Sequence, residues 1–428
     1  MNIFKLLGGL LFFSCFILSP AVGFAQISSS VEAFPIVYSD NSQDNLYVFC
    51  GEKGETKASL TATLPNGEAG SFDWEKLNVQ SGSFEAYISG ASTISNLADG
   101  CYRVKITSTS GVKIYRAWVF NNYLEAKAEI TESGCSSFML KGSLDSPAYN
   151  YIDLPTGQSK ILGKGITVKW MQGDTPVGSV LSQTIYNPSF QDTDYSLDIS
   201  DKFGCKANAS VKYISIVPKA SFDYTLGEQP GEKGNEAPLT VTFNNTSKNV
   251  DAGKYQWFLF KDLAKIKQEI ESKTFTDSIM ERIYSDDPSY TYEETGTYIV
   301  KLVAQKTSAN TVCYRTAYSD NIVIAESFID APNFFTPDET GDPGKYIVQF
   351  FSMKSIKITI FNRWGKVLHV WENNNVPGFT KAVEESVWDG KVGGRMATPG
   401  VYYYVAEGRG RDGVRRKASG FFHLFREK

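Results

Sequence analysis

Short runs in which apolar and polar residues alternate recur along this chain, and they constrain its fold more than any other feature. Examples are Ala58–Leu64, Tyr298–Leu302 and Ile356–Ile360, and turn residues such as those of Pro65–Gly67 separate such runs. A period of two places successive side chains on opposite faces of a strand, so each run predicts a strand with one buried face. Aromatic residues make up 14% and charged residues only 21% of the chain, which suits pleated, half-buried surfaces. The sequence therefore predicts an all-β fold.

The length and the charge narrow the class further. A chain of 428 residues is too long for one ordinary domain, so we expect three or four serial β-sandwiches. The formal net charge of −4 gives no indication of a nucleic-acid partner.

The first 25 residues have the pattern of a signal peptide. Lys5 supplies a positive charge, Leu6–Pro20 is apolar, and Gly23–Ala25 is a small-x-small cleavage site. An alternative is a lipoprotein acylated at Cys15. No later run reaches the 18 apolar residues of a membrane span, so we expect an exported chain that is soluble or bound to the cell surface.

Two successive segments share a Cys…Trp…Cys order. Residues 26–125 contain Cys50, Trp74 and Cys101, and residues 126–218 contain Cys135, Trp170 and Cys205. Both segments resemble immunoglobulin-like sandwiches. The resemblance implies the bridges Cys50–Cys101 and Cys135–Cys205, with Cys313 free and buried. The dispersed cysteines and the presence of only His369 and His423 argue against zinc.

Residues 219–328 resemble a polycystic-kidney-disease (PKD)-like β-sandwich. The resemblance rests on Pro238–Ser247, Tyr255–Phe258, Tyr290–Tyr292 and Gly296–Leu302. The charged segment 260–284 replaces a short turn of the family, with the apolar spacing of a helix in part of it. It is either a functional loop or a short covering helix.

The last hundred residues, 329–428, carry four separate blocks, namely Pro332–Pro337, Ile360–Gly365, Trp388–Gly390 and Thr398–Tyr404. Their order and spacing resemble the gliding-motility-associated, type B C-terminal sorting domain of proteins that Bacteroidetes export by type IX secretion. The resemblance implies export through the inner membrane, recognition by the type IX translocon with an outer-membrane β-barrel partner, and display on the surface or release. The residues that it assigns to translocon recognition are Asn333, Phe335, Thr336, Pro337, Asn362, Arg363, Trp364, Gly365, Trp388, Asp389, Gly390, Gly400, Tyr402 and Tyr404.

The block around Trp364 allows two interpretations. Trp364 could pack in the core while Arg363 pairs with Asp389, or these side chains could form part of the face that the translocon recognises. The final portion is also basic, with 14 Lys and Arg against 7 Asp and Glu between residues 354 and 428. Arg415–Lys417 would be either a soluble hairpin loop or a docking surface.

Catalytic motifs are not evident in this sequence. Both histidines fall in the C-terminal domain, without a Gly-x-Ser-x-Gly elbow. Adjacent carboxylates such as Glu293 and Glu294 would point to opposite faces of a strand, and no phosphate-binding glycine loop follows a strand. We therefore predict a protein that is not an enzyme and has no cofactor. Asp338 and Asp342 lie in an acidic turn that could supply part of a calcium site or could simply be solvated.

Three functional hypotheses follow. The favoured one is an exported multidomain protein that binds an unknown extracellular protein or glycan, as an adhesive or spacer protein. The second is an accessory component of the secretion or gliding apparatus. The third is a secreted polysaccharide-degrading enzyme whose carboxylates are not recognisable from sequence.

Overall fold

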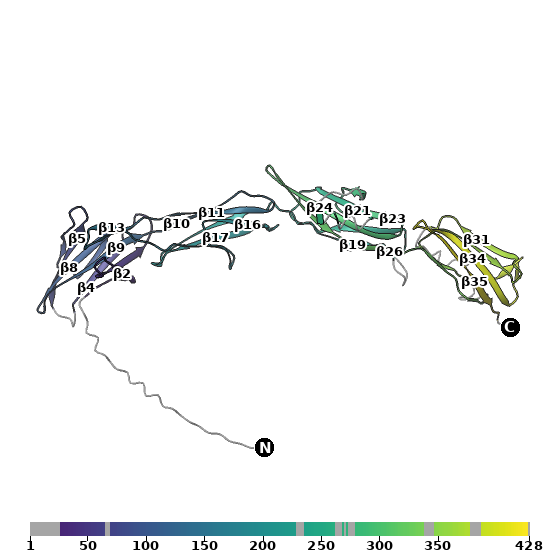
Figure 1. Ribbon diagram of the computed structural model, residues 1–428, viewed down its shortest axis with the longest axis horizontal. Coiled ribbons are helices and arrows are strands. Elements are labelled where there is room, and N and C mark those ends of the chain that lie inside the picture. Colours follow the sequence, from purple (N-terminus) through teal and green to yellow (C-terminus); the bar gives the residue numbers. More distant parts are fainter. Residues whose placement is uncertain are drawn as a thin grey trace, which may run out of the picture. The chain divides into compact units, whose positions relative to one another are not determined.

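The computed structural model describes residues 26–64, 69–227, 235–261, 268, 271–272, 279–337, 346–376 and 387–426. Within these residues the chain is almost entirely β-structure, arranged as serial sandwiches (Figure 1). It divides into two compact units, one of which holds residues up to 213 apart from 133–138 and 186–192, while those two segments and residues 214–428 form the other. The expected signal peptide, residues 1–25, lies outside the described residues.

The first sandwich packs a three-stranded sheet, β1-β4-β7, on a six-stranded sheet, β2-β3-β9-β8-β5-β6. Its strands are β1 (Gln26–Ser28), β2 (Ala33–Val37), β3 (Gln43–Cys50), β4 (Ala58–Thr63), β5 (Gly70–Asn78), β6 (Ser83–Ser89), β7 (Thr93–Leu97), β8 (Gly100–Ser108) and β9 (Gly111–Asn122). Leu60 from the small sheet meets Trp74 and Val104 from the large one in the core. The Trp74 indole donates a hydrogen bond to the Ala91 carbonyl at 2.8 Å, which satisfies its buried N–H group.

The second sandwich pairs the sheets β10-β11-β16 and β15-β14-β17-β18. Its strands are β10 (Glu125–Thr131), β11 (Ser137–Asp145), β12 (Asn150–Asp153), β13 (Gln158–Ile161), β14 (Thr167–Gln172), β15 (Thr175–Gly178), β16 (Ser182–Tyr186), β17 (Thr193–Ser200) and β18 (Lys206–Tyr213). A Cβ at Gly142 of β11 would lie 2.7 Å from the Leu197 side chain and 3.2 Å from Trp170. A larger residue at this position would therefore require the Leu197 and Trp170 side chains to shift.

The hairpin β12-β13 of the second sandwich lies on the outward face of the six-stranded sheet of the first (Figure 1). Tyr151 meets Trp118 with ring centroids 6.1 Å apart, and Tyr149 meets Phe120 at 4.6 Å. The Ser39 hydroxyl donates to Asp153 at 3.1 Å, and Lys160 pairs with that carboxylate. Trp118 is consequently only 2% exposed although it lies on the side of the sheet that faces away from the core.

The third sandwich combines the sheet β19-β20-β23 with β22-β21-β24-β25, to which β26 adds by pairing with β24. Its strands are β19 (Phe222–Leu226), β20 (Leu239–Asn245), β21 (Tyr255–Phe260), β22 (Ile279–Ile283), β23 (Ser289–Tyr292), β24 (Gly296–Ser308), β25 (Thr311–Tyr318) and β26 (Ile322–Ile324). Val241, Phe243 and Trp257 meet in its core. Of the segment 260–284, Gln268, Glu271 and Ser272 are helical and β22 pairs with β21, while most of the remainder lies outside the described residues.

The C-terminal sandwich is built on the sheet β28-β35-β34-β30-β31. Its strands are β27 (Phe328–Asp330), β28 (Phe334–Phe335), β29 (Gln349–Phe351), β30 (Met353–Phe361), β31 (Val367–Asn373), β32 (Lys391–Val392), β33 (Arg395–Met396), β34 (Gly400–Gly410) and β35 (Arg415–Leu424). Ile356, Ile358 and Ile360 are buried in its core, as their alternation predicts.

The disulfide bonds correct the first expected pairing. Cys50 bonds to Cys205, and Cys101 is a buried free thiol. Cys50 and Cys101 lie in one sheet with β9 between them, in register with Asn122 and Trp118 respectively. Two strand spacings of about 4.8 Å and an offset of four residues at about 3.3 Å each exceed the reach of a disulfide. The expected Cys50–Cys101 bridge is therefore wrong, and the bond instead joins the first sandwich to the second.

The second expected pairing is also wrong. Cys135 bonds to Cys313 of β25, so Cys313 is buried, as expected, but not free. Cys135 clusters with Ile216 and Val217, which follow β18 in the chain, whereas Cys205 precedes β18. The eight residues of this strand place the two ends about 26 Å apart, which excludes a Cys135–Cys205 bridge.

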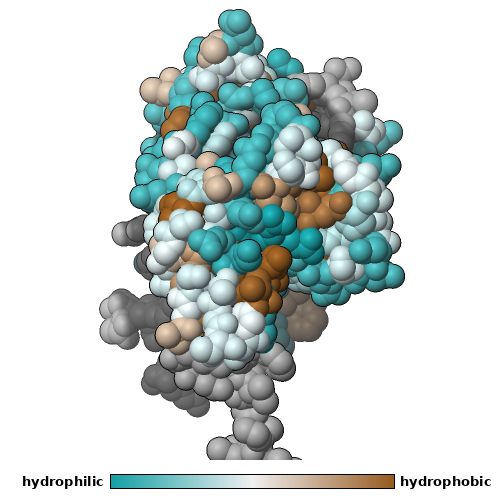
Figure 2. All heavy atoms as spheres, turned by 90° about the vertical axis from the view of Figure 1, so that its left-hand side faces the viewer, coloured by the Kyte–Doolittle hydropathy of each residue, from teal (hydrophilic) through white to brown (hydrophobic). Residues whose placement is uncertain are grey.

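The face drawn in Figure 2 shows separate small hydrophobic patches among hydrophilic and intermediate residues. Among the described residues, none belongs to a helix that is long and apolar enough to span a membrane.

Candidate functional site

Several residues of the C-terminal sequence blocks form the core of the C-terminal sandwich. Phe335, Trp388 and Tyr402 are almost completely buried. The rings of Phe335 and Trp388 lie 5.8 Å apart, and those of Trp388 and Tyr402 lie 5.5 Å apart. Tyr404 is half-buried beside the same core. These aromatic side chains hold the domain together from inside and are not available to a partner in the folded state.

Gly390 and Pro337 have a packing role as well. Gly390 has a φ of 77°, which favours glycine, and a Cβ there would lie 2.8 Å from Pro337 and 3.2 Å from Phe335. The Trp388–Gly390 block thus packs closely against the Pro332–Pro337 block. Thr336 is half-buried between Phe335 and Pro337. Asn333 is exposed, and its carbonyl accepts a hydrogen bond from the His423 N–H at 2.9 Å.

Gly400 and Tyr402 belong to a local arrangement that occurs at three places among the described residues. The Tyr402 hydroxyl donates to the carbonyl of Thr398, four residues earlier, at 2.7 Å. Tyr102 and Tyr298 make the same bond at 2.8 Å to Ala98 and Glu294. In each case a glycine with positive φ lies two residues before the tyrosine and begins a long strand. The arrangement, which we call the Gly-x-Tyr corner, occurs in two sandwiches that lie outside the C-terminal domain, so it orders a strand entry and is not specific to recognition.

The turn Asn362–Gly365 presents its side chains on the surface. The Asn362 carboxamide oxygen accepts the N–H groups of Trp364 at 3.0 Å and Lys366 at 2.9 Å, and Gly365 takes a φ of 79°. Trp364 is 74% exposed, and the Arg363 guanidinium lies over its ring at 4.2 Å. The interpretation that places Trp364 in the core is therefore wrong.

The expected ion pair of Arg363 with Asp389 is also not the one that forms. Asp389 is exposed, accepts the Lys391 N–H at 2.9 Å and lies 3.8 Å from the Lys391 ammonium. The local sequence already offered this alternative, because Lys391 follows Asp389 by only two residues.

A shallow pocket of about 150 Å³ joins this turn to the start of β34. Its lining residues are Asn362, Arg363, Trp364, Thr398, Pro399, Gly400, Val401 and Tyr402. Two of the sequence blocks thus meet at one surface site, although they are separated by more than thirty residues in the chain.

Next to this site, the outward face of the sheet carries aromatic side chains. Strand pairing places Phe334 beside His423, His423 beside Val401, and Phe421 beside Tyr403. Phe421 is 54% exposed and lies 5.7 Å from His423, which stacks on Phe425 at 5.8 Å. We call Phe334, Tyr403, Phe421, His423 and Phe425 the outer aromatic face. The sequence reasoning missed it, although the alternation within Gly420–Phe425 shows aromatic residues on both faces of the strand.

The basic segment is partly structural. Arg415–Lys417 begin β35 rather than forming a loop, and Arg416 pairs with Asp412 at 2.6 Å. Burial opposes ionisation of Asp412, but hydrogen bonds from Ser327 and Val414 and the charge of Arg416 hold its pKa below the ordinary value. The expected calcium ligands Asp338 and Asp342 lie outside the described residues, and the described residues contain no group of three or more potential metal ligands.

Residues 329–424 match the CHU_C family, the type IX secretion signal domain. The C-terminal sandwich is a type IX secretion signal domain. The resemblance drawn from the four sequence blocks is thereby confirmed. The domain implies export by the type IX secretion system across the outer membrane, to the cell surface or the extracellular space, and interaction with that system during export. The two disulfides fit an extracellular location.

The chain is also similar to solved structures of serial immunoglobulin domains. The N-terminal four domains of Dscam1 isoform 1.9 are 15% identical, with 42% of this chain and 45% of that chain covered and a TM-score of 0.25. A tetra-tandem repeat from the extending region of a large adhesion protein is 13% identical, with 89% and 99% covered and a TM-score of 0.25. A three-domain titin fragment is 11% identical, with 69% and 98% covered and a TM-score of 0.29.

The chain spans about half the length of the Dscam fragments that it matches. At these TM-scores the likenesses carry no argument beyond the fold that the sheets already show. No curated protein matches the sequence.

Proposed function

We propose that this protein is an exported binding protein, on the cell surface or released, whose first three sandwiches carry the binding surface and whose C-terminal domain directs its export. The observation that carries the proposal is the combination of a type IX secretion signal domain with two preceding sandwiches that a disulfide bond cross-links within one compact unit. This bond resists bending at the junction of the first and second sandwiches. That property suits a protein that presents a binding surface to other molecules.

Further support comes from the junction of the first two sandwiches. The Asn122 amide donates to Asp201 at 2.6 Å, and Lys164 donates to the Asn122 carbonyl oxygen at 2.7 Å. Together with the hairpin β12-β13 and the Cys50–Cys205 bond, these contacts make one unit of two sandwiches. A protein whose only need is export would not require such a rigid N-terminal part. We further propose that this part acts by binding and not by catalysis.

For export, we propose that the secretion machinery contacts the outer aromatic face together with the pocket beside Trp364. Aromatic residues and arginine are the side chains most enriched at the centres of protein interfaces. The proposed partners are the translocon and an outer-membrane β-barrel protein. The core residues Phe335, Trp388 and Tyr402 would contribute only by keeping that surface in shape.

The export part is tested by surface exposure in intact cells of the source bacterium. Full-length protein is compared with a chain that ends at Ser327, by the accessibility of each to added protease. We expect the truncated chain to remain in the periplasm. Arrival of the truncated chain at the surface would overturn the assignment and favour a structural component of the envelope.

The binding part needs a separate readout. Cells that lack the protein are compared with cells that display it, for attachment to surfaces coated with extracellular polysaccharide or protein. We expect attachment to fall on at least one surface when the protein is missing and to return with full-length protein. Unchanged attachment on all of them, with normal display, would contradict the proposed binding role.

A further inference from the structure

A row of four charged side chains crosses the six-stranded sheet of the first sandwich. Arg116 of β9 is directly opposite Arg103 of β8, and Arg103 is directly opposite Glu75 of β5. On the other side, Asp44 of β3 pairs with Arg116. Two like charges directly opposite each other are unfavourable in a sheet. The carboxylates at the two ends offset this cost, but the centre of the row remains a pair of guanidinium groups.

The two carboxylates leave much of each guanidinium available. Asp44 receives the Arg116 Nε at 3.1 and 3.3 Å, and Glu75 receives the Arg103 Nε at 2.5 Å. Within the described part of the chain, the terminal nitrogens of Arg103 and Arg116 donate no hydrogen bond. Both side chains are about one-third exposed, so these nitrogens are accessible to solvent.

The Asp44 carboxylate is not available to bind a ligand, because both of its oxygens already accept hydrogen bonds. Its side chain is buried, and the Tyr38 hydroxyl donates to it at 2.7 Å. That hydroxyl in turn accepts the Trp118 indole N–H at 2.8 Å. The chain from Trp118 through Tyr38 to Asp44 fixes the position of Arg116 from the covered side of the sheet.

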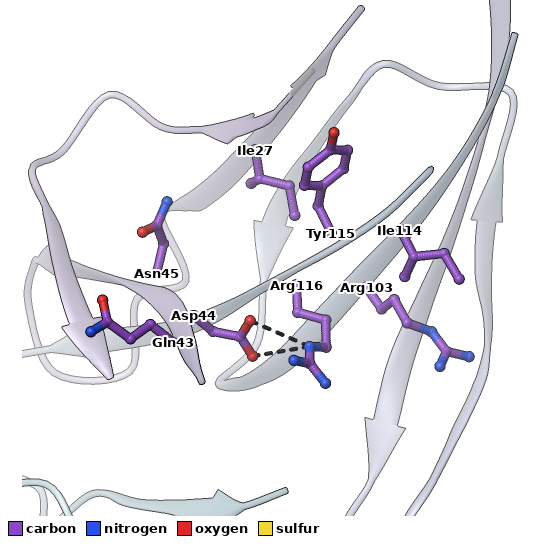
Figure 3. Close-up of a pocket in the computed structure, with 8 residues that line it drawn as sticks. All are labelled: Ile27, Gln43, Asp44, Asn45, Arg103, Ile114, Tyr115 and Arg116. Carbon is purple, nitrogen blue, oxygen red and sulfur yellow. Dashed lines mark hydrogen bonds and ion pairs between the residues drawn. The ribbon is translucent and has the colours of Figure 1, made fainter. Parts of the chain in front are cut away.

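A pocket of about 390 Å³ opens at this row, where β3 begins beside β9 (Figure 3). Asp44, Arg103 and Arg116 line it together with Gln43, Asn45 and Tyr115, and Ile27 and Ile114 supply apolar surface. Figure 3 shows Arg103 and Arg116 on the side of Asp44, with Ile27 and Tyr115 on the other side. The volume is at the lower end of the range for small-molecule sites.

We propose that this pocket binds an acidic sugar, with its carboxylate held by Arg103 and Arg116. A carboxylate matches the planar fork of a guanidinium, and such charge-assisted pairs are the stronger hydrogen bonds. The Gln43 amide lies beside Asp44 and both donates and accepts, which suits a hydroxyl group of a sugar ring. The inference rests on the proposed binding function and gives that function a ligand class, a uronic-acid-containing glycan.

The test is calorimetric titration of the purified full-length protein with three tetrasaccharides of the same linkage. One carries uronic acids, the second is neutral and the third is sulfated. We expect binding of the uronic-acid tetrasaccharide that is at least about tenfold tighter than that of the other two, because only its carboxylate forms planar charge-assisted pairs with the two guanidinium groups. Equal or tighter binding of the neutral or the sulfated sugar, or no binding of any, would overturn the proposal.

Variants locate the site. Arg103→Lys and Arg116→Lys keep the charge and the carboxylate partner but lose the fork, and each should weaken binding of the uronic-acid sugar by about fivefold to tenfold. The double variant Arg103→Gln with Glu75→Gln removes both charges of one pair and should weaken it by about tenfold or more. Lys105→Gln is the matched control, since Lys105 lies on the same face of β8 outside the pocket lining. Folding is checked for each by its thermal melting.

If all of these variants bind the uronic-acid sugar with the same affinity, the sugar binds elsewhere and the proposed site is wrong. The attachment assay keeps this failure distinct from failure of the proposed function. If cells displaying the Arg103→Gln, Glu75→Gln variant attach normally, the pocket is wrong and the binding role stands. If deletion of the whole protein leaves attachment unchanged, the binding role itself has failed.

Discussion

The first and the C-terminal sandwiches both carry aromatic residues on the outward face of their larger sheet, but only one of these faces is covered. In the first sandwich, Trp118 and Phe120 are buried beneath the hairpin β12-β13. In the C-terminal domain, Tyr403 and Phe421 are exposed. Within the described residues, the hairpin covers this face of the first sandwich, and no such hairpin covers the face of the C-terminal domain. An aromatic face that stays open in a secretion signal domain is the kind of surface that a partner covers.

The largest expected effect is on stability, and it comes from removing a covered aromatic side chain. Removing an open aromatic side chain gives the comparison. Trp118→Ala should lower the stability of the first unit by about 3–5 kcal/mol, because it deletes a buried indole and its hydrogen bond to Tyr38. Phe421→Ala should change the stability of its own domain by less than about 1 kcal/mol, since the ring is half exposed. Amide hydrogen exchange of β9 and β35 measures both.

For export we expect the opposite order, with Phe421→Ala having a larger effect than Trp118→Ala. Phe421→Ala should reduce the amount of protein that added protease can reach on intact cells, while the domain stays folded. Thr359→Ala, on the same face but outside the aromatic cluster, is the matched control. Normal display of the Phe421 variant would show that the open face is not part of the recognition surface.

The second-largest effect concerns the Cys50–Cys205 disulfide bond. This bond joins the first sandwich to the second, which supplies the covering hairpin. The pair of substitutions Cys50→Ser and Cys205→Ser should cost about 2–5 kcal/mol, because the bond closes a long loop in the unfolded chain. It should also raise the hydrogen exchange of Trp118 and its neighbours, whereas exchange in β34 and β35 should stay as it was. Cys101→Ser, the buried free thiol, is a control for changes in packing alone. Equal exchange in the presence and absence of the bond would mean that the hairpin contacts suffice.

Local patterns in the sequence predicted the strands well, and long-range order is what they could not supply. Ile356, Ile358 and Ile360 are buried as expected because alternation is a property of neighbouring residues. The pairing of Cys50 depends instead on β9 lying between β3 and β8. Nothing near Cys50 or Cys101 in the sequence encodes that order.

The site shows the same limit. The four C-terminal blocks predicted the secretion signal domain, but not which of their residues face outward. Nothing in the sequence near Trp388 and Trp364 indicates that they differ in exposure. In the structure Trp388 is buried and Trp364 is exposed. Alternation within Gly420–Phe425 assigns two faces to the strand, yet only the rest of the fold decides that Phe422 is covered and Phe421 is open.

A smaller effect on stability is expected at the Gly-x-Tyr corner, which the first and the C-terminal sandwiches share. Tyr102→Phe and Tyr402→Phe each remove the hydroxyl of a Gly-x-Tyr corner and leave the ring in place. Each should lower the stability of its own sandwich by about 1 kcal/mol, the net worth of one hydrogen bond. Thermal melting of each variant measures the loss. If Tyr402→Phe blocked export without destabilising its domain, the corner would have a recognition role that Tyr102 lacks.

The smallest effect is a pH dependence at the border of the third sandwich and the C-terminal domain. The Glu236 carboxylate is buried and accepts the Ser352 N–H at 2.7 Å. Burial raises the pKa of Glu236, and this outweighs the opposing hydrogen bond from Ser352. Because the folded state holds the proton more tightly, the stability from this group is complete below the unfolded pKa of about 4.3 and is lost as the pH rises through the higher folded pKa.

Glu236→Gln removes this titration and keeps the acceptor for the Ser352 N–H. Relative to the unsubstituted protein, the variant should therefore gain melting temperature between pH 4 and pH 8. Glu372→Gln, which alters an exposed ion pair with Lys357 and leaves Glu236 in place, is the control and should retain the pH dependence that Glu236 causes. Parallel melting curves for Glu236→Gln and the unsubstituted protein over this range would mean that Glu236 does not change its charge there. The charge of Glu236 would then have no effect on the border between the two sandwiches over this range.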